Sequence, residues 1–553
     1  MVHDEEEPAG TAGSNDSQAN AEPITGFGTG RRENQRVRIL GALASLAAPT
    51  VRALPPTAED NGSIPLSKPT GIDGTDAITT TGVLGDGPHG TTGDQTNDFD
   101  FYAVTASAGN ALVVDTSGGT VDTDTIVAVY TAAGDLVAAD DDSGTGFRSR
   151  LSYDVAADGT YFVLVAGYSS DGPLPADPND SGSGAGGAEV GPYSLAVSSR
   201  PVDHDYYALV LAAGDVIGST ATGQADGLTI YRVDGAQMVR AVGLDASSLY
   251  APNSPLPGGG NTTLAYVAEE AGTYAIQVSG EVGAYDANVE VYRPGAEIDR
   301  ASRVQTVFLD FDGARVNTGI GGGPGTRDLS PFSAFIGKWR LTRSQEGALI
   351  DKITAEVREN IRIDLIRKGF NDDVAVRVIN SKDNRDVFGQ ENVSRVIVGG
   401  TIDQSGIPTI GIAQYIDPGN YAHEDSALVL LDVLSDPAGD AASLNTYLKA
   451  SSNRADFVSQ AVGNVISHEI GHMIGNYHTD NVNEVVGLMD AGGTSFDNLY
   501  GVGPDGIGGT ADDTDTDFVT DRYIPADGFD GLENTLNVAA WAFGRGRGQV
   551  AAP

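Results

Sequence analysis

Short apolar runs, separated by turns rich in glycine and aspartate, fill the chain from about residue 73 to 296. FDFYAVTA (99–106), ALVVDT (111–116) and GTYFVLVAGY (159–168) have the length and β-branched content of strands. Strands at this spacing are typical of β-sandwiches. By contrast, residues 1–72 are rich in Gly, Ala, Pro and Ser and show little apolar periodicity. We therefore predict a disordered leader or linker over 1–72, followed by all-β structure.

The strand pattern occurs twice. DFDFYAVTASAGN at 98–110 matches DHDYYALVLAAGD at 203–215, and GTYFVLV at 159–165 matches GTYAIQV at 272–278. GPYSLAV, which begins at Gly191, is matched more weakly by GAYDANV, which begins at Gly283. Three matches in the same order indicate two copies of one module. We predict one β-sandwich over 73–200 and a second over 201–296.

From about residue 300 the pattern changes to mixed helix and strand. VQTVFLDFDG (304–313), DVAVRVIN (373–380) and SRVIVGG (394–400) are predicted strands. QEGALIDKITAEVRENIRIDLI (345–366) and NRADFVSQAVGNVISHEIGHMIG (453–475) carry apolar residues at helical spacing. The predicted fold class is therefore multidomain, with two all-β sandwich modules followed by an α+β domain over 297–548.

Composition narrows the range of partners. The 553 residues include 33 Lys and Arg against 76 Asp and Glu, which gives a formal net charge of −43. Nucleic acid and anionic membrane would be repelled, so cations are the expected partners, with a salt-adapted acidic surface as the alternative. Cysteine is absent, which excludes disulfides and thiolate ligands. No apolar run reaches the ~18 residues of a membrane span, so we expect no membrane insertion.

A segment that resembles a secretion signal lies late in the predicted leader. In RRENQRVRILGALASLAAPTVRA (31–53), Arg31, Arg32, Arg36 and Arg38 precede a short apolar run. Three interpretations remain: a true start downstream of Met1, a long leader of the twin-arginine type, or a short helix in a disordered tail. We expect export, and hence a secreted or extracellular protein of prokaryotic origin.

The segment HEIGHMIGNYH at 468–478 has the pattern of a metal centre. His468 and His472 lie one helical turn apart on one face, so both imidazoles can reach one ion. Gly475 can take a positive φ and end the helix, after which His478 returns as a third ligand. Zinc suits three imidazoles, with one position left for water. Glu469, beside the first ligand, is predicted to be the general base that takes a proton from that water.

This extended motif resembles that of the metzincins, which are zinc endopeptidases with a methionine turn below the metal. GLMDAG supplies that turn at Met489, and Thr479 after the third histidine resembles the pappalysin branch more than the matrixins. The resemblance implies a protein or peptide substrate and an edge strand that aligns it. Either ALVLLDVL (427–434) or TIGIAQYI (409–416) would be that strand.

The repeated modules resemble another family. Their D-x-D-x-Y start, AG turn and late GTYxxxV look like the bacterial pre-peptidase C-terminal (PPC) domain, a small β-sandwich of secreted peptidases. In this chain both modules come before the peptidase-like segment and not after it, so the resemblance leaves their role open.

Acidic turns suggest calcium as a structural cofactor. GPDGIGGTADDTDTDF (503–518) resembles a calcium loop, in which glycines allow tight turns between carboxylates. The first module also keeps aspartates in two loops where the second has lost them, so the first is the module expected to bind calcium. The candidate calcium ligands are Asp505, Asp512, Asp513, Asp515 and Asp517 in the late loop, and Asp122, Asp124, Asp140 and Asp142 in the first module.

Together these features predict a secreted zinc endopeptidase with Glu469 as its general base. Two other classes remain open. One is an extracellular binding or adhesion protein whose zinc domain is inactive, against which the intact Glu469 and Met489 argue. The other is a zinc amidase that acts on non-protein substrates.

Overall fold

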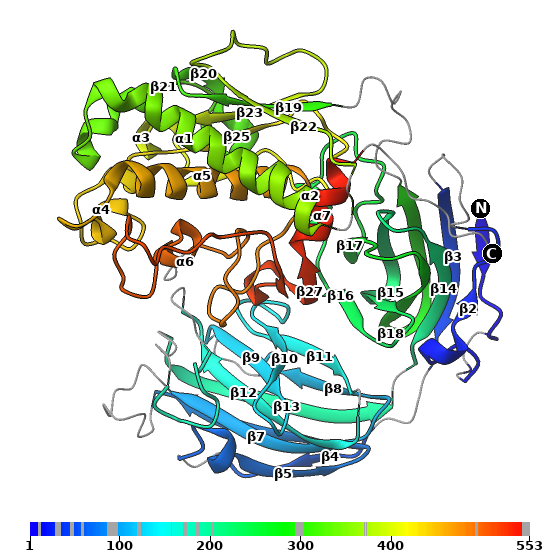
Figure 1. Ribbon diagram of the computed structural model, residues 1–553. Helices are drawn as coiled ribbons and strands as arrows, with labels where there is room; N and C mark the ends of the chain where they lie inside the picture. Colours follow the sequence, from blue (N-terminus) through cyan, green and yellow to red (C-terminus); the bar gives the residue numbers. More distant parts are fainter. Residues whose placement is uncertain are drawn as a thin grey trace.

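The computed structural model describes the chain except for residues 9–10, 12, 28–34, 45–48, 57–59, 86–97, 119–122, 156, 170–173, 184–188, 202, 293–303, 370, 372, 493–495 and 545–553. Two β-sandwich modules and an α+β region lie against one another (Figure 1).

The first module is a sandwich of two five-stranded sheets with the strand orders β10-β9-β12-β7-β5 and β11-β8-β13-β6-β4. Apolar side chains that alternate along each strand fill the space between the sheets. Its strands are β4 (Val51–Ala53), β5 (Lys68–Asp73), β6 (Asp76–Leu84), β7 (Phe99–Ala106), β8 (Asn110–Asp115), β9 (Thr125–Tyr130), β10 (Leu136–Asp140), β11 (Arg150–Asp154), β12 (Gly159–Gly167) and β13 (Gly191–Pro201).

The second module repeats this pairing order with longer strands. β14 pairs with the first half of β18, which pairs with the second half of β15, and that half pairs with β16. The other face runs from β3 to the second half of β18, then to the first half of β15 and to β17. Its strands are β1 (Val2–Asp4), β2 (Glu22–Pro23), β3 (Gln35–Leu43), β14 (Asp205–Leu211), β15 (Val216–Arg232), β16 (Gln237–Val242), β17 (Thr262–Val267) and β18 (Gly272–Tyr292).

The prediction of a disordered leader over 1–72 is wrong for the described residues. β3 pairs with β18, and Val37 and Ile39 are completely buried in the core of the second module. Arg36 and Arg38, assigned to the signal-like segment, form ion pairs with Glu290 and Asp286. The alternation of charged and apolar residues in QRVRILGAL is therefore that of a strand with one buried face. The arginine pair at 31 and 32 lies outside the described residues.

These pairings also correct the predicted module boundaries. β4 pairs with β6 and β5 with β7 in the first module, just as β1 pairs with β3 and β2 with β14 in the second. The second module therefore begins near residue 2 and resumes at β14. The first module is inserted between β3 and β14, and does not simply precede the second.

Both modules contain the same buried tyrosine cluster. In the first, the Tyr193 hydroxyl lies 2.6 Å from the Tyr102 hydroxyl and donates to Asp100. Gly82 leaves the space that the Tyr193 ring occupies. The matching set in the second module is Tyr285, Tyr207, Asp205 and Gly41. This equivalence supports the internal repeat that the sequence predicts.

The α+β region is built on a five-stranded mixed sheet of order β22-β19-β23-β25-β24. β24, from TIGIAQYI, is antiparallel to β25 and forms the edge, whereas ALVLLDVL supplies the internal strand β25. A separate hairpin, β20 (Ala314–Asn317) and β21 (Thr326–Leu329), lies beside this sheet. The sheet strands are β19 (Gln305–Asp310), β22 (Val376–Asn380), β23 (Val393–Val398), β24 (Gly411–Ala413) and β25 (Ser426–Val429).

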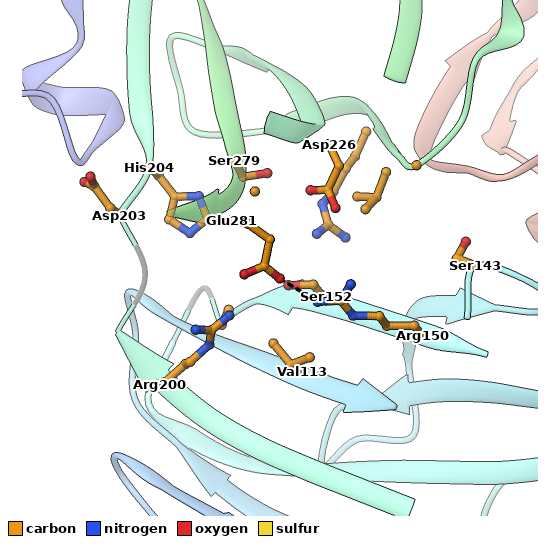
Figure 2. A pocket seen from close by; sticks show the side chains of 15 residues that line it. Val113, Ser143, Arg150, Ser152, Arg200, Asp203, His204, Asp226, Ser279 and Glu281 are labelled. Carbon is orange, nitrogen blue, oxygen red and sulfur yellow. Dashed lines mark hydrogen bonds and ion pairs between the residues drawn. The ribbon is translucent and has the colours of Figure 1, made fainter. Parts of the chain in front are cut away.

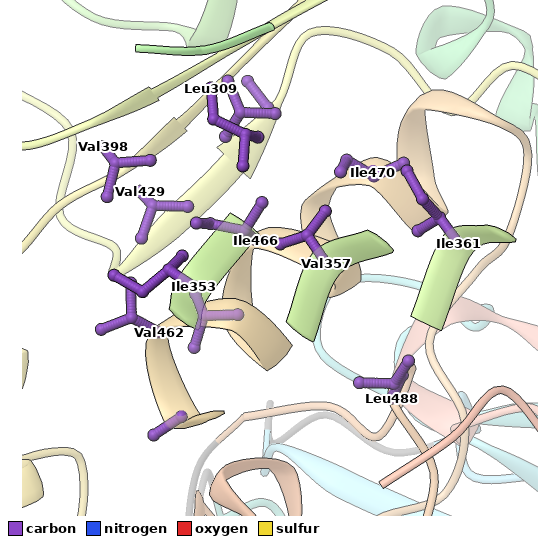
Figure 3. Packing of buried hydrophobic residues seen from close by; sticks show 14 of the residues in the cluster. Leu309, Ile353, Val357, Ile361, Val398, Val429, Val462, Ile466, Ile470 and Leu488 are labelled. Carbon is purple, nitrogen blue, oxygen red and sulfur yellow. The ribbon is translucent and has the colours of Figure 1, made fainter. Parts of the chain in front are cut away.

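Two long helices, α1 and α5, cover one face of this sheet. Ile353 and Val357 of α1 pack against Ile466 of α5, and Val398 and Val429 of the sheet belong to the same core (Figure 3). α1 continues through a π-helical turn, Glu359–Asp364, into α2. The helices are α1 (Glu346–Arg358), α2 (Leu365–Lys368), α3 (Ile402–Ser405), α4 (Leu444–Tyr447), α5 (Arg454–Met473), α6 (Phe496–Tyr500) and α7 (Thr535–Ala542).

The α+β region and the second module share one sheet. After α6, the chain forms β26 (Thr520–Arg522) and β27 (Phe529–Asn534), and β27 pairs antiparallel with β16 (Figure 1). The ring of Tyr477 lies 4.7 Å from that of Phe529 and belongs to the core of the second module. The predicted boundary near residue 297 therefore does not separate two independent units.

The contact between the two sandwiches is polar. Arg150 pairs with Glu281 at 2.8 Å, and the His204 Nε2 lies 3.2 Å from Asp154. Arg150, Glu281 and His204, together with Arg200, line a cavity of about 80 Å³. Figure 2 shows these four side chains around it. No backbone pairing joins the sheets of the two modules in the described part of the chain.

Candidate metal centre

α5 presents the predicted site residues from the buried core. Nearly every side chain from Phe457 onward is buried, and His468 and His472 are each 7% exposed. The predicted helix over 453–475 agrees with the observed span, Arg454–Met473. At Gly475 the backbone has a φ of +108°, and a Cβ there would overlap Pro418. This glycine therefore permits the turn that returns His478 to the helix face.

The three histidines form a triangle. Their ring centroids are 4.8 Å (His468 to His472), 5.4 Å (His468 to His478) and 4.7 Å (His472 to His478) apart. His468 Nδ1 lies 2.6 Å from the Leu488 carbonyl, and His472 Nδ1 lies 2.8 Å from the Asn476 carbonyl. Because the Nδ1 atoms are engaged as donors, the Nε2 lone pairs remain for a common ion.

The electrostatic environment favours neutral imidazoles. Burial, with the neighbouring histidines, lowers the pKa of His468 well below its usual value and lowers the pKa of His472 to about 3. A metal ion binds the neutral form, so these rings need not lose a proton to bind it at neutral pH. Three imidazole nitrogens at this spacing fit a zinc ion, and within the described residues no carboxylate completes a fourth ligand.

Glu469 lies beside the triangle without joining it. The side chain is 4% exposed, and burial raises its pKa to about 8. Its Oε2 is buried and has no hydrogen-bond partner in the described part of the chain. A Cβ at Gly411 of β24 would overlap Glu469 Oε1, so the glycine brings the edge strand directly against this carboxyl. The group is thus placed to exchange a proton with a molecule in the cleft.

Met489 lies beneath the helix that carries the histidines. A Cβ at Gly471 would overlap the Met489 sulfur, so the glycine between the two ligands makes room for it. The Thr479 amide donates to the Met489 carbonyl at 2.8 Å, and the Thr479 hydroxyl donates to Asp490 at 3.0 Å. These bonds connect the chain after the third histidine to the methionine turn.

An open cleft of about 760 Å³ contains the three histidines and Glu469. Its walls come from β24 and the segments flanking it, from the start of α6, and from the short helix η4 (Ala246–Leu249) of the second module. Most of the lining side chains are apolar. They include Ile320, Ile402, Ile410, Ile412, Ile416, Val433, Val465, Phe496 and Leu499.

Sequence reasoning missed two carboxylates that support the third histidine. Asp527, which ends η12 (Pro525–Asp527), accepts from the His478 amide at 3.2 Å and lies 3.2 Å from its Nδ1. Glu533, 3% exposed on β27, accepts from the Tyr477 amide at 2.9 Å. Both residues follow the motif by about 50 positions. No spacing rule connects them to it, and only the fold brings them there.

The structure divides the predicted calcium loop into two parts. Asp505, Asp512 and Asp513 accept hydrogen bonds from backbone amides of their own loop. Asp515 and Asp517 instead meet Glu359 and Asp364, with ligand oxygens all within 4.8 Å of one another. Lys368 reaches this group and pairs with Asp517 at 2.6 Å and with Asp364 at 3.3 Å. This amine already supplies part of the positive charge that the carboxylates need.

In the first module, Asp124 and Asp142 meet Asp141, which sequence reasoning did not include. Asp140 lies outside this group and accepts from the Arg150 amide at 2.7 Å. The predicted ligand at 122 lies outside the described residues. Burial and the neighbouring aspartates raise the pKa of Asp141 to about 7.

A further acidic group lies in the second module, where the sequence predicted none. Glu7 and Asp203 are 7% and 5% exposed, and their ligand oxygens lie within 4.8 Å of one another and of Asp16. The neighbouring Asn15 is 2% exposed, and its side-chain oxygen has no hydrogen-bond partner in the described part of the chain. The acidic residues of EEEPAGTAGSND (5–16) are the sequence feature that could have indicated this group, but they fall in the segment predicted to be a disordered leader.

Comparison with known proteins identifies one domain. The model of the bacterial pre-peptidase C-terminal domain matches residues 98–167, from β7 to β12 of the first module. No curated protein matches the chain. The solved structures to which the chain is similar include the following two. One is Aeromonas hydrophila PliG, a periplasmic inhibitor of g-type lysozyme, with 14% identity over 28% of this chain and 100% of that one and a TM-score of 0.15. The other is the major capsid protein P2 of bacteriophage PM2, with 10% identity over 35% and 91% and a TM-score of 0.13. At these TM-scores neither likeness carries an argument about fold or function.

Proposed function

We propose that the chain is a zinc-dependent endopeptidase of the metzincin type. The observation that supports this most strongly is the triangle of His468, His472 and His478, with Glu469 unpartnered beside it. Structural zinc sites are closed by four protein ligands, whereas three ligands and a nearby carboxyl suit a catalytic one. The antiparallel edge strand, the helix that carries the motif and Met489 below it also agree with the metzincin resemblance.

The residues around the cleft take separate roles in this proposal. The three Nε2 atoms hold the ion, and Asp527 keeps the His478 ring oriented. When bound, zinc supplies a Lewis acid that acidifies water and polarises a peptide carbonyl. Glu469 accepts the proton of the attacking water at its free Oε2 and gives it to the departing amine. The outer edge of β24, Gly411–Ala413, would align an extended peptide, which would replace the bonds that the Thr409 hydroxyl makes to the Gly411 backbone.

The cleft favours a peptide over the alternative substrates. An edge strand beside Glu469 can pair with successive peptide units of one chain, which a small amide lacks. An inactive zinc domain would not need Glu469 buried beside the histidines with a free oxygen, because burial of a carboxyl without a partner destabilises the fold. We therefore retain the endopeptidase as the single candidate function.

The domain match bears on the cellular location. A PPC domain at 98–167 is consistent with an extracellular or secreted protein. Among the described residues, no helix is long and apolar enough to cross a membrane.

Metal analysis and one substitution test the proposal. We expect about one zinc per chain, and we expect Glu469→Gln to retain it while losing at least about 10²-fold in kcat/KM on casein or a peptide library. Glu356→Gln is the matched control. Glu356 of α1 is a half-buried glutamate, and burial likewise raises its pKa, to about 7, but it does not line the cleft. Full cleavage by Glu469→Gln, or a protein that takes up no zinc, would overturn the proposal.

A further inference from the structure

The second module reaches the cleft through η4. Asp245 caps this short helix, and its Oδ1 accepts from the Ser247 amide at 3.1 Å and from the Ser247 hydroxyl at 2.6 Å. Ser248 and Leu249 at its end line the same cleft as His468 and Glu469. A β-sandwich outside the α+β region therefore supplies part of the wall of the candidate active site.

Backbone hydrogen bonds connect Leu249 to the metal centre. The Leu249 carbonyl accepts from the Ile416 amide at 2.9 Å, and the next amide, that of Asp417, donates to the His472 carbonyl at 3.2 Å. The consecutive residues Ile416 and Asp417 thus connect η4 to the end of α5. The position of Leu249 relative to the histidines is set by bonded contacts and not by a mobile surface loop.

Packing keeps the two regions in this arrangement. Ile416 packs against the core of the second module, to which Tyr477 also belongs. The Tyr292 ring of β18 meets the Tyr421 ring edge-on at 5.3 Å, and β27 continues the sheet of the module. Rotation of the module away from the cleft would break this apolar contact and the β16–β27 pairing together.

Leu249 is nevertheless 45% exposed, in a cleft whose other lining side chains include five isoleucines, two valines and Phe496. Within the described lining, the ionisable side chains are the three histidines, Glu469 and Tyr415. An apolar side chain that packs against the apolar part of this wall would remove its surface from water, which contributes about 25 cal/mol per Å².

We propose that Leu249 is a specificity-determining residue. Its side chain contacts a large apolar side chain of an extended peptide that lies along β24. The inference rests on the proposed function, because it names the substrate class of the same cleft: peptides with Leu, Phe or a similar residue close to the cleaved bond. It also gives the second module a role, since the module completes the substrate site.

A single exposed leucine is common on protein surfaces, so the test needs a matched control. Leu66 provides it. This residue lies in the short helix η2 (Ile64–Leu66) of the first module, is 43% exposed and does not line the cleft. The chain has no cysteine, so Leu249→Cys and Leu66→Cys each introduce a single reactive thiol.

The first measurement is thiol labelling by a maleimide in zinc-loaded Glu469→Gln protein, which binds peptide without cleaving it. A saturating Leu- and Phe-rich peptide is expected to slow labelling of Leu249→Cys at least fivefold and to leave Leu66→Cys unchanged. The same peptide with aspartate in place of its apolar residues should protect neither. Equal labelling of Leu249→Cys with and without the apolar peptide would overturn the proposal.

The second measurement is the cleavage profile of a peptide library. Leu249→Glu should lower kcat/KM for apolar peptides at least tenfold and raise the share of cleavage at sites with Lys or Arg, while Leu66→Glu keeps the wild-type profile. An unchanged profile for Leu249→Glu in an enzyme that cleaves peptides overturns the inference alone. If the apolar peptide protects the thiol of Leu249→Cys but the wild-type chain cleaves no peptide, the proposed function is overturned and the Leu249 contact stands.

Discussion

The two β-sandwiches share one pairing order and the same buried tyrosine cluster, yet they are joined to the rest of the molecule differently. The first meets the second across polar contacts such as Arg150–Glu281, around a cavity. The second continues its sheet into β27 and takes Tyr477 into its own core. The same module is therefore a separate attachment in one case and a part of the candidate active site in the other.

The physical basis of the difference is the kind of contact. Ion pairs with partly exposed side chains contribute about 0–1 kcal/mol each, and they can form and break without disturbing either sandwich. A shared sheet and a shared core remove apolar surface and backbone groups from water, so the two parts cannot separate without exposing both. Each prediction below tests one side of this comparison.

The largest effect is expected from breaking the shared sheet. Gly531 of β27 faces β16 with a φ of +125°, and a Cβ there would overlap the Met238 carbonyl. Gly531→Val should separate β27 from β16 and displace Asp527 and Glu533, which hold the third histidine. We expect zinc affinity to fall at least about 100-fold, measured by competition with a chelator of known affinity.

A matching clash in the first module is the control. A Cβ at Gly167 of β12 would overlap the Glu189 carbonyl, so Gly167→Val strains the first sandwich in the same way. It should lower thermal stability without changing zinc affinity. Because Gly531→Val also risks misfolding, Asp527→Ala removes the contact to His478 alone and should cost about 10-fold to 100-fold in zinc affinity. Unchanged affinity in both Gly531→Val and Asp527→Ala would show that the second module does not support the metal centre.

The part of the fold that could be predicted from sequence was the part fixed by local signals. The helix over 454–473 follows from apolar spacing, and the meeting of His468, His472 and His478 follows from one helical turn and one glycine. The repeat was visible because both copies keep the aspartate and tyrosines of one buried cluster.

What could not be predicted depends on pairing between distant strands. The strand with Val37 and Ile39 was assigned to a leader, because its partner lies about 250 residues later in β18. The insertion of the first module was hidden for the same reason. Asp527 likewise reaches His478, and Leu249 the cleft, only through the shared sheet, which no periodicity within a short window indicates.

The next effect concerns calcium, which the sequence assigned to the late loop over 503–518 and to the first module. The acidic group of the second module is more buried, with Glu7 at 7% and Asp203 at 5% exposure. Removing a bound cation should therefore destabilise the second module more. At 100 times its Kd, a cation stabilises a fold by about 2.7 kcal/mol, so a shift of several degrees in melting temperature is expected.

The measurement uses a calcium-selective chelator, with zinc content checked before and after, followed by calcium at fixed ionic strength. The pair Glu7→Gln and Asp16→Asn should abolish the calcium response, whereas Asp141→Asn with Asp142→Asn should reduce it less. Equal restoration by NaCl would mean that the carboxylates are only screened. A response lost only in the Asp141 and Asp142 variant would return calcium to the first module.

A smaller effect is expected from the aspartates of the tyrosine clusters. Burial, with Glu5 beside it, raises the pKa of Asp205 to about 9. The pKa of this carboxyl is therefore higher in the folded chain than in the unfolded chain, where it is about 3.9. The group's contribution to the stability of the fold is present in full below pH 3.9 and is lost progressively as the pH rises toward 9. Asp205→Asn removes this loss and keeps an acceptor for Tyr285, which bonds Asp205 at 2.7 Å.

The melting temperature of Asp205→Asn relative to wild type should therefore increase from pH 5 to pH 9, by about 2–4 °C for each kcal/mol recovered. In the first module Asp100 has Lys68 as a neighbouring opposite charge. Asp100→Asn should show no such gain at high pH. Parallel pH profiles for the two variants would contradict the difference in their surroundings.

The smallest effect is expected from removing the first module altogether. The Ala44 amide donates to Asp203, so the two ends of the insertion lie within hydrogen-bonding distance of each other. A short Gly-Ser linker between these residues should close the second module without strain, because few residues are needed to span such a gap. The excision loses the ion pair of Arg150 with Glu281, the contacts of Asp154 with His204 and Gln277, and the hydrogen bond that Arg522 donates to the Leu136 carbonyl. Among the described residues it loses no β-pairing to the rest of the chain and no residue that lines the cleft. We expect one zinc per chain, kcat/KM within about threefold of the full chain and the same cleavage profile, since contacts of this kind contribute about 1 kcal/mol or less each. Loss of zinc on excision, with the protein still folded by circular dichroism, would show that the first sandwich also belongs to the active unit, and the contrast between the two modules would fail.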